Sequence, residues 1–237
     1  MKKSVLTFLI PILLSVTLFA SCTTGNGSGN GQGDKTTDTE LKVSDYFPFI
    51  ENIHMAYKGN GNEYAQYETY VEYIKDNIMQ IRNVNPGTTS AVVYELKSGE
   101  LKRILNRGEV YYRHDYTSSK DEEEILIKEP IKEGTSWTLK DGTKRRITSL
   151  KKSVSTPSGS YTALEVTSEG PYSIITDYYV KDIGLVKKIF KSKENDTIIS
   201  SELEKIEKNV PYKERIRLYF PDFNKDKLAY INREVEY

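Results

Sequence analysis

Residues 77–106, NIMQIRNVNPGTTSAVVYELKSGELKRILN, carry the pattern that decides the fold. Three runs rich in Ile, Val, Leu and Tyr, at 77–84, 91–97 and 101–106, are separated by short turn sequences at 85–87 and 98–99. Turn signals about every ten residues leave room for hairpins but not for the longer crossovers that parallel strands need. The stretch therefore predicts an antiparallel meander.

The same alternation of apolar runs and turns continues along the chain on both sides of this stretch. Eighteen Tyr residues and only three Met favour strands over helices. Further strands are expected at 53–57, 64–74, 110–116, 125–128, 134–139, 146–154, 161–167, 174–181 and 185–191. Residues 198–206 predict either a last strand or a short helix. A sheet of about ten strands must curl to protect its edges, so we expect an all-β domain at 46–209 that forms a curved sheet or an incomplete or closed barrel.

Aromatic side chains on the predicted strands are the candidate ligand contacts. Strand alternation within 64–74 predicts one apolar-leaning face made of Ala65, Tyr67, Thr69, Val71 and Tyr73. Trp137, the single tryptophan, is expected to fill the core with its N–H bonded to a nearby carbonyl. Large aromatic side chains in a cleft would suit a lipid or a sugar, and the alternative is that they only build the core. The binding candidates are Tyr67, Tyr73, Tyr112 and Trp137.

The N-terminus has the pattern of a secretory signal peptide at residues 1–21. Lys2 and Lys3 form a basic head, an apolar run follows at 6–20, and Ser21 is small. At about fifteen residues this run is shorter than the roughly 20 that span a bilayer, and Pro11 argues further against a permanent helix. We therefore expect the segment to be cleaved.

Residues 18–22, LFASC, resemble the bacterial lipobox, in which a cysteine receives a diacylglycerol before signal peptidase II cuts ahead of it. The resemblance implies that lipid on Cys22 attaches the protein to the extracytoplasmic face of the cell membrane, since several acyl chains give stable anchoring. The alternative is ordinary cleavage near Ala20, which leaves Cys22 as a lone thiol. Residues 22–45, with the run GNGSGNGQG at 25–33, are expected to form a flexible tether.

Charge and residue usage restrict the kind of partner and chemistry. The chain has 34 basic and 34 acidic residues, and loss of Lys2 and Lys3 with the signal leaves 32 against 34, a formal balance of −2. Nothing in this balance calls for nucleic acid. His54 and His114 are the two histidines and Cys22 is the single cysteine, so we predict no metal site, no cofactor and no catalytic residue. The acidic run at 121–124 is interpreted as a solvated loop.

Four segments resemble a family of lipoproteins from spore-forming and related Firmicutes: DYFP at 45–48, GEVYY at 108–112, GTSWTLKDG at 134–142 and DYYVKDIGLV at 177–186. In that family a β-rich region is often followed by a GerMN domain, a module named in spore germination and sporulation proteins. Residues 210–237 resemble the start of that domain, mainly through RIRLYFPD at 215–222. The resemblance implies a lipid-anchored β domain, and it implies no functional residue in the last segment.

These observations favour a non-catalytic, membrane-anchored envelope lipoprotein whose β domain binds an envelope protein, a lipid or a glycan. The alternative is a cell-envelope hydrolase acting on glycan or peptide, although the sequence selects no pair of carboxylates for such chemistry. A third interpretation, a structural accessory in sporulation or germination, follows from the resemblance alone.

Overall fold

The computed structural model describes residues 40–210. The predictions on the signal peptide, on lipidation of Cys22, on most of the tether and on the GerMN-like segment lie outside the described residues. The described chain is built almost entirely of strands, which confirms the all-β prediction. In chain order its elements are α1 (Val43–Tyr46), β1 (His54–Asn60), the 3₁₀ helix η1 (Glu63–Ala65), β2 (Tyr67–Lys75), β3 (Ile78–Val84), β4 (Thr89–Lys97), β5 (Glu100–Arg107), β6 (Glu124–Lys128), β7 (Ser136–Thr138), β8 (Lys144–Thr156), β9 (Gly159–Glu169), β10 (Ser173–Val180), β11 (Gly184–Ser192) and β12 (Ile198–Glu207).

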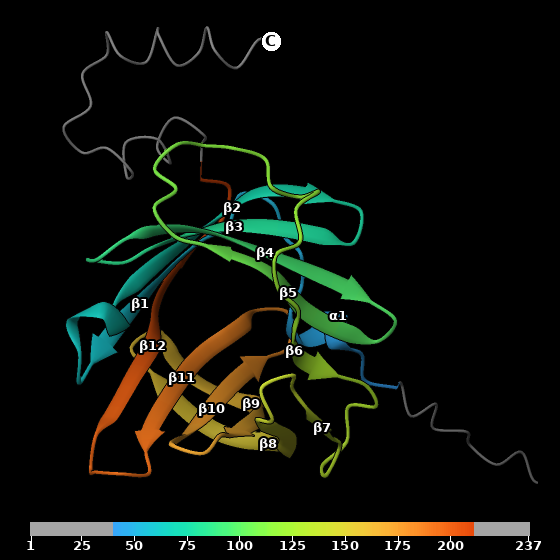
Figure 1. The fold of residues 1–237 in the computed structure, drawn as a ribbon, viewed down its shortest axis with the longest axis vertical. Helices are drawn as coiled ribbons and strands as arrows, with labels where there is room; N and C mark the ends of the chain where they lie inside the picture. Colours follow the sequence, from blue (N-terminus) through green and yellow to red (C-terminus); the bar gives the residue numbers. More distant parts are fainter. Residues whose placement is uncertain (1–39, 211–237) are drawn as a thin grey trace, which may run out of the picture. The chain divides into compact units, whose positions relative to one another are not determined.

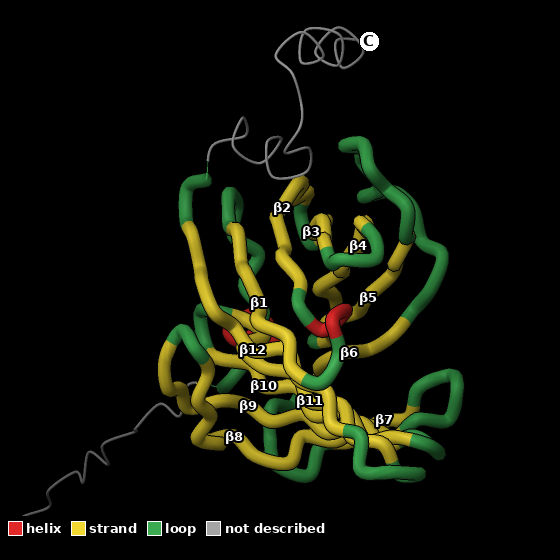
Figure 2. Tube along the Cα trace, turned by 90° about the vertical axis from the view of Figure 1, so that its left-hand side faces the viewer, coloured by secondary structure: helices red, strands yellow, loops and turns green. Residues whose placement is uncertain are grey.

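All of these strands belong to one 12-stranded antiparallel sheet with the order β6-β5-β4-β3-β2-β1-β12-β11-β10-β9-β8-β7. We call β1 to β6 the first run and β7 to β12 the second run, because each is a meander of strands that pair with their chain neighbours. The pairing of β1 with β12 joins the two runs in the middle of the sheet. The sheet curls so that the runs face each other, as Figures 1 and 2 show, which makes an incomplete barrel with β6 and β7 as its edges.

Side chains bridge the gap between these two edge strands. The indole Nε1 of Trp137 on β7 donates to the carbonyl oxygen of Ile125 on β6 at 3.0 Å, and Nη1 of Arg145 donates to the same oxygen at 3.1 Å. Arg145 also pairs with Glu124. The indole is buried in the core, so the predicted role of Trp137 is confirmed.

The interior between the runs holds the main core, and α1 packs into it. Val43 is fully buried, and its backbone N–H donates to Glu129 Oε1 at 2.9 Å. The chain therefore begins to pack ahead of Tyr46, where the sequence places the start of the domain. Within residues 40–210, no helix combines the length and hydropathy that crossing a membrane requires. The core side chains shared by α1 and both runs include Val43, Tyr46, Leu101, Ile127, Trp137, Ile147, Leu164, Val166 and Tyr179.

Residues 108–123 connect β5 to β6 as an irregular loop over the outer face of the first run, so the predicted strand at 110–116 is wrong (Figure 1). Arg82 donates to the carbonyl oxygens of Val110 at 2.6 Å and Tyr112 at 2.9 Å. Gln80 donates to that of His114 at 2.7 Å. Side chains of β3 thus satisfy backbone groups that a neighbouring strand would otherwise satisfy. The apolar pattern of the loop gave no sign of this long-range pairing.

β2 contains a bulge at Glu72, because the register of its pairing with β3 shifts between Val71 and Tyr73. A bulge inserts one residue into the alternation, so the side chains beyond it change face. The predicted common face of Tyr67 and Tyr73 is therefore wrong. Tyr67 lies on the concave side, whereas the ring of Tyr73 lies 4.5 Å from the guanidinium of Arg113 in the outer loop.

Candidate functional site

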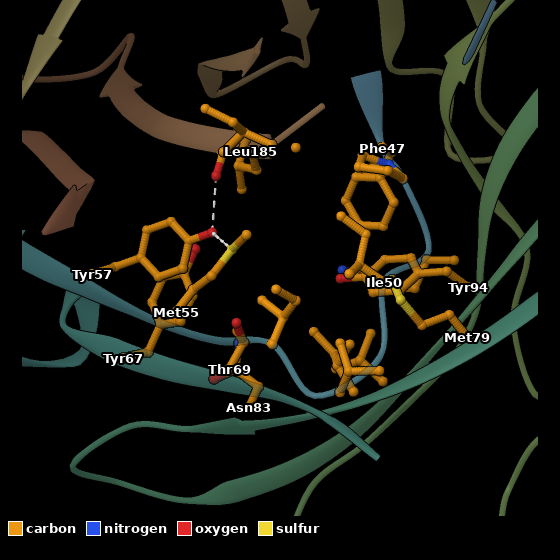
Figure 3. Close-up of a pocket in the computed structure, with 18 of the residues that line it drawn as sticks. Phe47, Ile50, Met55, Tyr57, Tyr67, Thr69, Met79, Asn83, Tyr94 and Leu185 are labelled. Carbon is orange, nitrogen blue, oxygen red and sulfur yellow. Dashed lines mark hydrogen bonds between the residues drawn. The ribbon is translucent and has the colours of Figure 1, made fainter. Parts of the chain in front are cut away.

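A cavity of about 240 Å³ lies on the concave side of the first run, against the chain segment before β1 and the start of β11 (Figure 3). Protein interiors leave few voids larger than a water molecule, so a space of this size is a candidate ligand site. It exceeds the roughly 150 Å³ cavity that holds benzene in an engineered protein. Its lining consists of Phe47, Pro48, Ile50, Ile53, Met55, Tyr57, Tyr67, Thr69, Val71, Met79, Ile81, Asn83, Val92, Tyr94, Arg103, Asn106, Ile183, Gly184, Leu185 and Lys188.

The alternation of side chains between the two faces of each strand places most of these residues in the cavity lining. Successive side chains of a strand point to opposite faces, so every second residue of four neighbouring strands reaches the cavity. These residues are Met55 and Tyr57 on β1, Tyr67, Thr69 and Val71 on β2, Met79, Ile81 and Asn83 on β3, and Val92 and Tyr94 on β4.

Aromatic rings form two walls of the cavity. The rings of Tyr57 and Tyr67 stack with centroids 4.4 Å apart, and those of Phe47 and Tyr94 lie 5.0 Å apart. The hydroxyl of Tyr57 donates to the carbonyl oxygen of Leu185 at 2.8 Å, a bond drawn in Figure 3, and so ties β1 to β11 across the interior. Packed rings and this hydrogen bond therefore form two sides of the cavity.

The hydroxyls of Tyr67 and Tyr94 have no hydrogen-bond partner among residues 40–210. Burial raises the pKa of Tyr94 to about 12, and burial together with neighbouring tyrosines and Asp177 raises the pKa of Tyr67 well above its ordinary value. Both side chains are therefore neutral at physiological pH and can donate or accept. Buried Tyr hydroxyls usually find a partner, so these two are available to a ligand.

Asp177 on β10 lies directly opposite Lys188 on β11, with Oδ1 of the carboxylate 3.5 Å from Nζ of the lysine. Asp177 is 1% exposed, and no group in the described chain donates a hydrogen bond to its Oδ1. The Lys188 side chain is 45% exposed and contributes to the cavity lining. A buried carboxylate is therefore in contact with one lining residue and has hydrogen-bonding capacity to spare.

The other charged group in the lining is engaged by protein carboxylates. Arg103 on β5 pairs with Glu122 and with Glu124, each at 2.6 Å. Glu124 also pairs with Arg145 of β8. This network neutralises Arg103, so Lys188 is the more available cation at the cavity.

The predicted binding candidates do not form one site. Tyr67 lines the cavity, and Trp137 lies in the core at the gap between β6 and β7. Tyr73 lies on the outer side, and Tyr112 is 72% exposed on the outer loop. Tyr94, Asp177 and Lys188 were missed from sequence. The sequence does contain a signal for Asp177. By strand alternation Ile175, Asp177 and Tyr179 share one face of β10, and Asp177 is the one charged residue among these three.

A second polar cluster lies on the outer side, around His54. Nδ1 and Nε2 of His54 hydrogen-bond to Glu207 at 2.7 Å and to Glu68 at 3.1 Å, and its ring stacks on Tyr70 with centroids 4.3 Å apart. Burial opposes protonation, but the bonds to Glu68 and Glu207 raise the pKa of His54 above its ordinary value. Lys205 pairs with Glu207 at 2.7 Å. Across the described ranges, no three His, Cys, Asp or Glu side chains are grouped so that they could hold a metal ion.

Comparison with known proteins gives two partial likenesses to solved structures. No family model and no curated protein matches the chain. One solved structure, from Bacteroides fragilis, is described as an exported protein with a YmcC-like fold. It is 13% identical, with a TM-score of 0.42, over 69% of this chain and 99% of the other. A second, from Parabacteroides distasonis, is described as a lipoprotein and is 14% identical, with a TM-score of 0.40, over 68% of this chain and 98% of the other.

Proposed function

We propose that this chain is a lipid-anchored extracytoplasmic protein that binds a small, largely apolar ligand in the cavity and releases it unchanged. The observation that carries the proposal is the cavity of about 240 Å³, whose walls are mostly Ile, Val, Met, Leu and aromatic side chains. Filling such a space with an apolar group removes apolar surface from water, at about 25 cal/mol per Å². Of the protein, lipid and glycan partners that the sequence leaves open, a mostly apolar cavity supports a lipid-like molecule best.

The exposure of two lining residues supports entry of a ligand into the cavity, either from solution or from a membrane surface. Ile50 is 36% exposed and the Lys188 side chain 45% exposed, yet both belong to the cavity lining. The cavity therefore reaches the protein surface beside these two residues, and a ligand can enter without unfolding of the sheet.

Binding is tested with the neutral fluorophore N-phenyl-1-naphthylamine and the mature chain carrying Cys22→Ser, so that no lipid competes. We expect saturable fluorescence enhancement. Thr69 is half-buried and lines the cavity on β2, and Thr69→Phe should fill the space and weaken binding at least about tenfold. Thr162→Phe, the same change at an exposed position of β9, is the matched control. Absence of saturable binding, or equal effects of the two variants, would refute the proposal.

The non-catalytic part of the proposal has its own test. The ligand recovered after incubation with the protein should be chemically unchanged by mass spectrometry. Turnover of a glycan, a peptide or the bound molecule would instead support the hydrolase alternative.

Anchoring is tested by metabolic labelling with an alkyne-bearing palmitate analogue. We expect label on the wild-type chain in the membrane fraction, and none on Cys22→Ala, because the lipobox resemblance implies lipid attachment through that thiol. A labelled Cys22→Ala chain would exclude this site of attachment. A sporulation or germination role rests on the family resemblance, and normal sporulation and germination of a deletion strain would remove it.

A further inference from the structure

The charged side chains that line the cavity are both cationic. They are Arg103 and Lys188, and no Asp or Glu side chain of residues 40–210 belongs to the lining. Asp177, the carboxylate beside Lys188, lies outside the lining and is 1% exposed. A ligand in the cavity therefore meets positive charge but no carboxylate that it could bind.

Of the two cations, Lys188 has hydrogen-bonding capacity to spare. Arg103 is held by two glutamates, each at 2.6 Å. The ammonium of Lys188 has three donors, and among the described residues its one polar neighbour is Asp177 Oδ1 at 3.5 Å. That separation is longer than the 2.7–2.9 Å typical of a charge-assisted hydrogen bond. Lys188 can therefore donate to a ligand without giving up a short bond to the protein.

Lys188 also lies where a charged group can be bound without full loss of its water. Its side chain is 45% exposed and contributes to the lining, and Ile50, another lining residue, is 36% exposed. A head group bound to Lys188 stays partly hydrated, so it avoids the large cost of a fully buried ion. An apolar chain attached to that head group can fill the mostly apolar remainder of the cavity. The site therefore fits an amphiphile with one charged end.

The sign of that charge follows from which groups the ligand can reach. A carboxylate would contact the ammonium of Lys188, whereas the buried Asp177 carboxylate lies farther from it. Coulomb energy falls with distance, so the nearer opposite charge outweighs the more distant like charge. An ammonium head group would instead meet the like charge of Lys188. A neutral hydroxyl could accept a hydrogen bond from Lys188, but it gains no attraction between full charges.

We propose that the ligand is a short-chain amphiphile with a carboxylate head group, which bonds to Lys188 while its apolar chain fills the cavity. This inference rests on the proposed binding function and adds the chemical class of the ligand. Lys188 is the residue that selects the head group.

The test uses three probes with chains of equal length: octanoate, 1-octanol and octylammonium. Each displaces N-phenyl-1-naphthylamine from the mature chain carrying Cys22→Ser at pH 7.5. We expect octanoate to bind at least about tenfold more tightly than either of the others, the factor expected for a hydrogen bond between two charged groups in place of a weaker one. Equal binding of all three probes, or tighter binding of 1-octanol or octylammonium, overturns the inference.

Variants then test Lys188 itself. Lys188→Gln alone would leave the buried Asp177 carboxylate uncompensated and could unfold the chain, so the lysine is removed in an Asp177→Asn background. Asp177→Asn should bind octanoate at least as tightly as the wild type, because only a like charge is lost. Adding Lys188→Gln should weaken octanoate binding at least about tenfold and change 1-octanol binding by less than about threefold.

The matched control adds Lys191→Gln to Asp177→Asn. Lys191 is an exposed lysine on the same strand, β11, and lies outside the lining, so octanoate should bind as it does to Asp177→Asn alone. Retained fluorophore binding shows that each variant is folded. Equal effects of the two lysine substitutions would overturn the role of Lys188.

The two levels of proposal fail in distinguishable ways. If the fluorophore binds and Thr69→Phe blocks it, but octanoate has no preference that depends on Lys188, the cavity function stands and the head-group inference falls. If the fluorophore does not bind the unchanged cavity, the binding function fails and this inference falls with it.

Discussion

The indole N–H of Trp137 donates a 3.0 Å hydrogen bond to the carbonyl oxygen of Ile125, across the gap between the two edge strands of the sheet. Consecutive strands elsewhere in each run are joined by backbone ladders, whereas β6 and β7 are connected through side chains. The bond therefore closes the curled sheet where backbone pairing stops.

Trp137→Phe keeps an aromatic ring in the core and removes the N–H. We expect a loss of unfolding free energy of about 1–2 kcal/mol, from one hydrogen bond and the smaller ring, with Arg145 still donating to the same carbonyl. Urea unfolding followed by circular dichroism measures it. Tyr172→Phe, at a residue that is 68% exposed, should change stability by less than about 0.5 kcal/mol. Equal losses in the two variants would contradict this role for the indole.

The Arg82–Glu72 pair anchors the outer loop, and Arg82→Met should destabilise the protein by about 3–5 kcal/mol. The pair lies at 2.8 Å with side chains 1% and 3% exposed, so removal of the arginine leaves a buried carboxylate uncompensated. Hydrogen exchange across residues 108–116 should also accelerate, since the arginine holds two carbonyls of that loop.

The control for Arg82→Met is Lys75→Met. Lys75 pairs with Asp115, but the two side chains are 58% and 33% exposed. Solvent screens such pairs, so we expect a loss of at most about 1 kcal/mol. Similar losses for the buried and the exposed pair would show that Arg82 does not anchor the loop.

Stability should depend on pH through His54. Its pKa in the folded protein is raised above the ordinary value near 6.5, so its contribution is fully present below about pH 6.5 and is lost as pH rises through the folded pKa. His54 also lowers the pKa of Glu68, whose contribution is present above about pH 4.5 and is lost as pH falls through its folded pKa. The cluster should therefore stabilise most between about pH 4.5 and 6.5.

Urea unfolding between pH 5 and 9 checks this window. The wild-type chain should lose unfolding free energy above pH 6.5 relative to His54→Gln, which lacks the titrating ring. Thr162→Gln, at an exposed position of β9, should keep the wild-type pH dependence. If the unfolding free energy of His54→Gln changes with pH in parallel with that of the wild type, then His54 does not stabilise the protein selectively between about pH 4.5 and 6.5.

Two glycine substitutions separate backbone strain from steric overlap. Gly61 and Gly142 have φ of +82° and +85°, which L-residues rarely adopt. A Cβ on Gly61 would lie 2.4 Å from the carbonyl oxygen of Ile198, whereas one on Gly142 would meet no atom within 4 Å. Gly142→Ala should cost about 1–2 kcal/mol from the backbone alone, and Gly61→Ala should cost clearly more. Equal losses of unfolding free energy in the two variants would show that the backbone around Gly61 shifts to accommodate the added Cβ without further cost.

Local sequence was sufficient for the architecture of the sheet. Alternation and closely spaced turns predicted antiparallel hairpins, because both are set by residues near one another in the chain. Residues 77–106 form three paired strands as expected. The buried role of Trp137, and its hydrogen bond to a carbonyl, also followed from residue type alone.

Tertiary structure decided the site. The bulge at Glu72 separates Tyr73 from Tyr67, and the loop at 108–123 is held by Arg82 and Gln80 rather than by a strand. Asp177 and Lys188 meet because β10 and β11 pair in one particular register. The charge of Asp177 contributes to the raised pKa of Tyr94 in the first run only because the sheet curls and brings the two runs near each other. Periodicity determines which face of a strand is apolar, but curvature and register determine which faces meet, since these depend on contacts between residues far apart in the chain.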